Sequence, residues 1–129
     1  MRVGLQKEES SAYQLAFVTF VIPLALLGAP VNDARAQASH SFDLQVAQGR
    51  LISGPPTVLV KRGDTVELRW TSDSSTTVHL HGYDLQVTVS PLSTASMRFQ
   101  AHATGRFPVE THAASGRHVT LLYVEVHPR

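Results

Sequence analysis

The stretch Thr57-Val-Leu-Val-Lys-Arg-Gly-Asp-Thr-Val-Glu-Leu-Arg-Trp70 contains two alternating segments on either side of a polar turn. Successive side chains of a β-strand face opposite sides, so the second segment directs Val66, Leu68 and Trp70 to one face. Gly63 supplies the backbone freedom that a tight turn needs. The pattern predicts a β-hairpin whose Trp70, the only tryptophan, packs in a hydrophobic core.

The same alternation with a period of two recurs along the chain. It predicts further strands at 41–47, 77–81, 85–89, 97–101, 107–111 and 119–126, with a short extension at 51–52. Pro108 indicates that its strand lies at a sheet edge or contains a bulge. No segment has a sustained apolar stripe with helical spacing, so we expect an all-β fold, built as an antiparallel sandwich or barrel.

The N-terminal region has the pattern of a secretory signal peptide. Arg2 and Lys7 precede a nearly uninterrupted apolar run at 15–28. The run is close to the lower limit of ~17 residues for a bilayer span, which makes an uncleaved membrane anchor the alternative. Export implies a periplasmic or secreted protein that has no membrane contact after cleavage.

Two sites with small residues at the required spacing follow the apolar run, Ala34-Arg-Ala36 and Ala36-Gln-Ala38. They predict a signal peptide at 1–36, with cleavage after residue 38 as the second option. No repeat or low-complexity linker divides the remainder. We therefore expect one domain at 39–129.

The composition gives no sign of a nucleic-acid partner and rules out disulfide bonds. The chain has 11 Lys and Arg against 10 Asp and Glu, with a formal net charge of +1, so no basic surface indicates nucleic acid. Cysteine is absent, so an exported domain of this size must be held together without disulfides. A single small core has to supply the stability.

The run Thr77-Val-His-Leu-His-Gly-Tyr-Asp84 carries the main chemical signal. On a strand His79 and His81 share one face, about 7 Å apart by strand rise, while Val78 and Leu80 face the other side. Neutral imidazole is a good ligand for copper or zinc. Two ligands alone make a weak metal site, so further donors are needed.

Three pieces in this order resemble the cupredoxins of the plastocyanin and azurin type. They are Val60-Lys-Arg-Gly-Asp-Thr-Val-Glu-Leu68, His79-Leu-His-Gly-Tyr-Asp84 and Gly105-Arg-Phe-Pro-Val109, followed by a loop with histidines and a last strand. The resemblance covers nearly all of the exported part. It implies a Greek-key β-sandwich of a single domain.

The resemblance also implies where a metal would bind. Copper-carrying cupredoxins use a histidine after a middle strand, then a cysteine, a histidine and often a methionine near the last strand. His79 or His81 matches the first ligand, and His112 and His118 lie in the last loop. Thr111 stands where the cysteine would be. Without that thiolate, the electron transfer of blue-copper proteins is not expected.

We therefore expect a copper ion held by His79, His81, His112 and His118, with zinc as the alternative ion and Glu110 as an alternative donor. The protein would carry, store or deliver the ion. Met97 falls on the wrong strand for an axial ligand.

Two other functions compete with metal binding. The histidines could be solvated or hydrogen-bonded, and the domain would then be a non-metal interaction module with a periplasmic protein partner. An enzyme is not expected, because no serine lies in a Gly-x-Ser-x-Gly elbow and no carboxylate pair is isolated in an apolar setting.

Overall fold

The computed structural model describes residues 36–112 and 115–129. Nearly all of the signal peptide expected at 1–36 lies outside these residues, so it remains a prediction. Within the described ranges no helix has the length and apolarity needed to cross a membrane.

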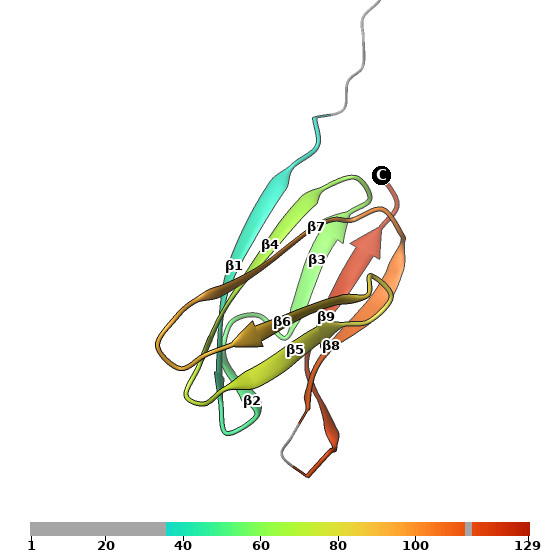
Figure 1. Cartoon of the computed structure of the whole chain (residues 1–129). Helices are drawn as coiled ribbons and strands as arrows, with labels where there is room; N and C mark the ends of the chain where they lie inside the picture. The colour runs from blue at the N-terminus through green and yellow to red at the C-terminus, as the bar shows by residue number, and fades with distance from the viewer. Residues whose placement is uncertain (1–35, 113–114) are drawn as a thin grey trace, which may run out of the picture. The chain divides into compact units, whose positions relative to one another are not determined.

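The described residues form nine strands in two sheets (Figure 1). The strands are β1 (Ser39–Ala47), β2 (Arg50–Ser53), β3 (Thr57–Lys61), β4 (Thr65–Ser72), β5 (Thr76–Leu80), β6 (Leu85–Val89), β7 (Ala95–Gln100), β8 (Gly105–His112) and β9 (His118–His127). Every expected strand is present, with ends that differ by at most two residues. The all-β prediction is confirmed.

One sheet has the strand order β2-β1-β4-β7 and the other has the order β3-β9-β8-β5-β6. Their inner faces supply one hydrophobic core, to which Leu44, Leu68 and Trp70 contribute from the first sheet and Leu80 and Leu122 from the second. Trp70 has no exposed surface, as expected from its position at the end of an alternating segment. The two sheets form a β-sandwich because each has one apolar face to bury.

The hairpin predicted for residues 57–70 is wrong. The turn exists, with Gly63 at a φ of +96°, but β3 and β4 enter different sheets. β3 pairs in parallel with β9, and β4 pairs in parallel with β1, so the sheets are mixed and not purely antiparallel. Alternation decides which side chains are buried, but it does not decide which strands become neighbours.

The strand that contains Pro108 is not at an edge, because β8 lies between β5 and β9. The alternative prediction was a bulge, and β8 contains a shift in register of this kind. The register between β8 and β9 shifts one residue beyond Pro108, between Val109 and Glu110. Such a bulge changes the direction of the side chains that follow it.

Candidate metal centre

The candidate site lies on the outer face of the five-stranded sheet, across β5, β8 and β9. Val78 and Leu80 of β5 are fully buried, so His79 between them faces outward. His79 is paired with Glu110 of β8, and Glu110 is paired with Thr120 of β9. Paired residues on neighbouring strands share a face, so these side chains come together outside the core.

Glu110 lies at the centre of this group. His81 Nε2 donates to Glu110 Oε2 over 2.8 Å, and His118 Nδ1 lies 3.3 Å from the same oxygen. The Thr120 hydroxyl donates to Glu110 Oε1 over 3.2 Å. One ligand atom from each of His81, Glu110 and His118 lies within 4.8 Å of the other two. We call these three residues the Glu110 cluster.

Two more histidines flank the Glu110 cluster, one on each side. The ring of His79 lies against that of His81, with centroids 4.3 Å apart, and the ring of His112 lies against that of His118 at 4.2 Å. His79 Nε2 is also 3.7 Å from Asp84 Oδ1. The structure thus brings His81 and His118 to one carboxylate and places His79 and His112 next to them.

The electrostatics of the Glu110 cluster favour a charged carboxylate. Burial raises the pKa of Glu110, but hydrogen bonds from His81, Thr120 and His118 and the nearby charge of His81 outweigh it, so this pKa lies below its usual value. A carboxylate that stays ionised beside two imidazoles is a suitable donor set for zinc or for divalent copper.

The position of His81 depends on the turn that follows β5. Gly82 has a φ of +82°, and a Cβ at this position would overlap the ring of Phe107. The His81 backbone N–H donates to the Pro108 carbonyl over 3.1 Å. Only glycine allows the turn to pack this closely on Phe107, and the turn holds the backbone of His81 against β8.

Solved structures with the same strand arrangement include auracyanin A, a "blue" copper protein from Chloroflexus aurantiacus. It aligns with a TM-score of 0.54 and 12% identity over 70% of this chain and 100% of that chain. The periplasmic domain of cytochrome oxidase subunit II from Bradyrhizobium japonicum aligns with a TM-score of 0.57 and 12% identity over 72% and 87%. The chain has the cupredoxin fold.

Another cupredoxin-fold neighbour, the blue copper oxidase of Nitrosomonas europaea, aligns with a TM-score of 0.57 and 21% identity. The alignment covers 70% of this chain and 39% of the oxidase, so the chain spans well under half of that enzyme's length. No protein-family model and no curated protein sequence matches the chain. At these identities the likeness establishes the fold alone.

The structure also shows how Thr111 lies, the residue at the cysteine position that the sequence resemblance implies. Thr111 is 1% exposed and faces the core, where its hydroxyl contacts the hydroxyl of Thr76. Its neighbours Glu110 and His112 face the opposite side of β8. The Glu110 cluster is therefore on the outer face of the sheet, whereas Thr111 points into the sandwich.

Among the residues that the structure describes, no sulfur ligand lies near the Glu110 cluster. Met97 is 4% exposed and packs in the core from β7, which belongs to the other sheet of this cupredoxin fold. The prediction that it lies on the wrong strand is confirmed. His112 and His118, expected in a loop, are paired with each other as the last residue of β8 and the first residue of β9.

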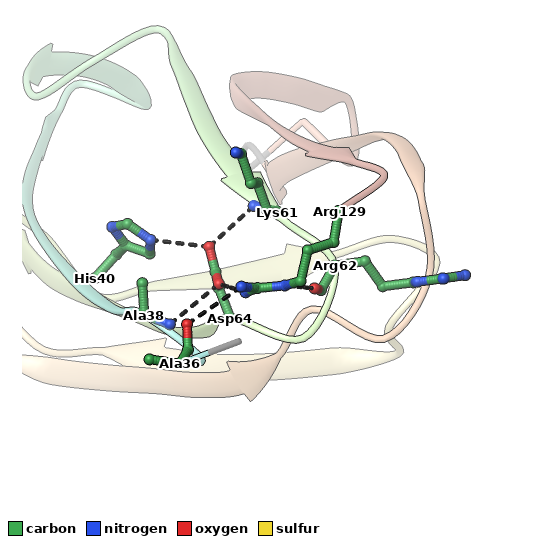
Figure 2. A network of polar contacts seen from close by, with 7 residues as sticks. All are labelled: Ala36, Ala38, His40, Lys61, Arg62, Asp64 and Arg129. Atoms are coloured by element: carbon green, nitrogen blue, oxygen red, sulfur yellow. Dashed lines mark hydrogen bonds and ion pairs between the residues drawn. The ribbon is translucent and has the colours of Figure 1, made fainter. Parts of the chain in front are cut away.

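A second contact between an imidazole and a carboxylate lies elsewhere in the molecule (Figure 2). His40 Nε2 donates to Asp64 Oδ2 over 3.0 Å, and the Lys61 N–H donates to the same oxygen over 3.0 Å. The other oxygen, Oδ1, accepts from the Ala38 N–H at 3.2 Å and from the Arg129 guanidinium. We call His40, Asp64 and Arg129, with these backbone groups, the Asp64 cluster.

Asp64 is 3% exposed, and its position in a polar turn did not predict this. Burial raises its pKa, but hydrogen bonds from Lys61, His40 and Ala38 and the charge of Arg129 outweigh that effect and leave the pKa below its usual value. Both oxygens are in contact with donors from the protein. The Asp64 cluster is therefore a structural contact and not a metal site.

The sequence reasoning included Glu110 only as an alternative donor and did not single out Asp64. For Glu110 a signal was present, because alternation placed it on the face opposite Val109. What alternation could not supply was the strand pairing that puts His79 opposite Glu110. For Asp64 no signal distinguished it from an ordinary turn residue.

Proposed function

We propose that the protein binds a copper ion at the Glu110 cluster and carries, stores or delivers it in the periplasm or outside the cell. The observation that supports this proposal is the convergence of two imidazole nitrogens and one carboxylate oxygen within 4.8 Å. Glu110 and His118 lie on the paired strands β8 and β9, and His81 lies in the turn directly after β5. Donors held in place by the surrounding fold need little reorganisation to bind an ion.

The donor set favours divalent copper over monovalent copper. Imidazole and carboxylate suit oxidised copper and zinc, whereas thiolate and thioether ligands select monovalent copper. The chain has no cysteine, and the described methionine, Met97, is buried in the other sheet. We propose that the site holds an ion without fast electron transfer and without catalysis. Zinc is the alternative ion.

The second candidate is a non-metal interaction module on the same scaffold. It is favoured by the fact that His81 and His118 already have a partner in Glu110, at 2.8 and 3.3 Å, so a metal is not needed to satisfy these polar groups. In this case the imidazole and carboxylate contacts would stabilise the outer face of the sheet for a protein partner.

Titration of the purified full chain with copper(II), in competition with a chelator of known affinity, separates the two candidates. We expect micromolar or tighter binding. Replacement of His81 and His118 together by alanine removes two of three donors. It should weaken binding by more than the ~10–100-fold loss typical when a residue that only hydrogen-bonds to a metal ligand is replaced. His127→Ala is the matched control, since this exposed histidine contacts Glu125 and not Glu110.

Two results would contradict the proposal. If the wild-type chain bound neither copper nor zinc at micromolar concentration, the interaction module would be the better account. If the double variant bound copper as tightly as the wild type and the His127→Ala control, the ion would bind elsewhere.

A further inference from the structure

We propose that the outer face of the sheet binds two metal ions, bridged by the carboxylate of Glu110. This inference rests on the proposed metal binding and extends it. One ion would take His79 and His81, and the other would take His112 and His118.

The arrangement of the side chains is the first argument. Two pairs of imidazoles lie on either side of a single carboxylate, and the ring centroids within the pairs are 4.3 and 4.2 Å apart. One member of each pair, His81 or His118, contacts Glu110 directly. The two halves of the site are thus equivalent in donor type and similar in spacing.

The spacing within each pair suits one shared ion. Imidazole nitrogens bind zinc at ~2.0–2.1 Å, so two of them in tetrahedral geometry lie roughly 3.3 Å apart. Rings with centroids 4.2 to 4.3 Å apart can reach that separation by rotation about their own side-chain bonds. Each pair is therefore a bidentate site without movement of the backbone.

A single ion would leave two of the imidazoles unused. The donor atoms that already lie within 4.8 Å of one another belong to His81, Glu110 and His118 only. His79 and His112 are outside this group. The ring of His79 lies against that of His81, and the ring of His112 lies against that of His118. Two ions would use all four histidines.

Each half of the site is carried by a different part of the backbone. His79 lies in β5, and His81 follows two residues later, directly after the strand ends. His112 and His118 are cross-strand partners where β8 meets β9. Glu110 lies opposite His79 in the register and two residues before His112, so it is placed between the halves.

Glu110 has the two oxygens that a bridge needs. Its Oε2 contacts both His81 and His118, while its Oε1 contacts only the hydroxyl of Thr120 among the described residues. Carboxylates join metal ions in two-metal sites, where the ions are ~3.5–4 Å apart. A bridging carboxylate also places its negative charge between two cations, which reduces their repulsion.

The test is the number of copper(II) ions bound per full chain, measured by native mass spectrometry and by titration, together with electron paramagnetic resonance. We expect two ions per chain and a resonance intensity below that of two independent ions, because the bridge couples their spins. His79→Ala and His112→Ala should each bind one ion with full intensity. The control variant His127→Ala should still bind two.

The outcomes separate this inference from the proposed function. No bound ion would contradict both. One ion in the wild type, lost on replacement of His81 and His118, would support the proposed function and overturn the two-ion site. Two ions with full intensity, unchanged in Glu110→Gln, would overturn the bridge. Loss of one ion in His127→Ala would show that the second ion binds at that exposed histidine and not here.

Discussion

The Glu110 cluster and the Asp64 cluster both join imidazole to a carboxylate, but they differ in what else reaches the carboxylate oxygens. Asp64 is 3% exposed and accepts from two backbone N–H groups and a guanidinium as well as from His40. The Glu110 side chain is 19% exposed and is contacted by two imidazoles and a hydroxyl. Asp64 has permanent N–H donors besides its imidazole, whereas the nitrogen contacts of Glu110 among the described residues come from imidazoles alone.

This difference separates a structural contact from a binding site. A guanidinium and a backbone N–H do not release their hydrogens near neutral pH, so they leave no lone pair for a cation. A neutral imidazole has a lone pair on one ring nitrogen and can bind a cation through it. The same pair of residue types therefore stabilises the fold in one place and offers a metal site in the other.

The largest expected effect is on stability. Asp64→Ala would leave the Arg129 guanidinium and the N–H groups of Lys61 and Ala38 without their partner, and we expect the free energy of unfolding to fall by about 3–5 kcal/mol. Glu110→Ala should cost about 1 kcal/mol or less, because its partners can turn to water. Urea denaturation of the metal-free variants measures both. Equal losses would remove the distinction between the clusters.

The next largest effect is expected on copper(II) affinity. Here the ranking of the two clusters is reversed, and Glu110 matters more than Asp64. Glu110→Gln keeps the side-chain shape but removes the charge. We expect copper(II) affinity to fall by about 10–100-fold, which is the loss seen when residues that only hydrogen-bond to a metal ligand are replaced. Asp64→Asn should leave affinity unchanged. Competition with a copper(II) chelator provides the comparison. A similar loss in Asp64→Asn would mean that the Asp64 cluster also takes part in binding.

A smaller effect should appear as a pH dependence of stability. The pKa of Asp64 is lower in the folded protein than its ordinary value of 3.8. The folded state thus gains stability from this group above pH 3.8 and loses it as the pH falls through the folded pKa. In Asp64→Asn this contribution is absent. The difference in unfolding free energy between wild type and variant should shrink as the pH is lowered from 5 to 3, and a constant difference would contradict this account.

The smallest effect is expected for a third pair of this kind. His127 Nε2 donates to Glu125 Oε1 over 2.8 Å, but both side chains are open to solvent. We expect His127→Ala to change the free energy of unfolding by less than about 0.5 kcal/mol, since exposed ion pairs contribute little. Thermal and urea unfolding would show it. A larger loss would indicate that the exposure of a pair does not predict how much it contributes to the free energy of unfolding.

Local patterns were sufficient for much of the fold. Alternation located every strand, because the direction of a side chain on a strand depends only on its place in the chain. It also placed Trp70 in the core and put His79 and His81 on the face opposite Val78 and Leu80. The same patterns were wrong for residues 57–70, where two adjacent segments enter different sheets.

The candidate site could be predicted only in part, because its members are distant in the sequence. His81 and Glu110 are separated by 29 positions, and Asp64 and Arg129 by 65. Whether such residues meet depends on the register of paired strands, which the packing of the whole core selects. The central position of Glu110 thus became visible only in the structure.

The sequence by itself determined that the chain is an all-β protein, that no thiolate is available to a metal, and that His79 and His81 share one face. Composition and side-chain alternation are enough for these conclusions. The tertiary structure decided that this face lies outside the sandwich, that Glu110 joins His81 to His118, and that Asp64 is buried against Arg129. These results depend on strand pairing, which is a property of the folded chain as a whole.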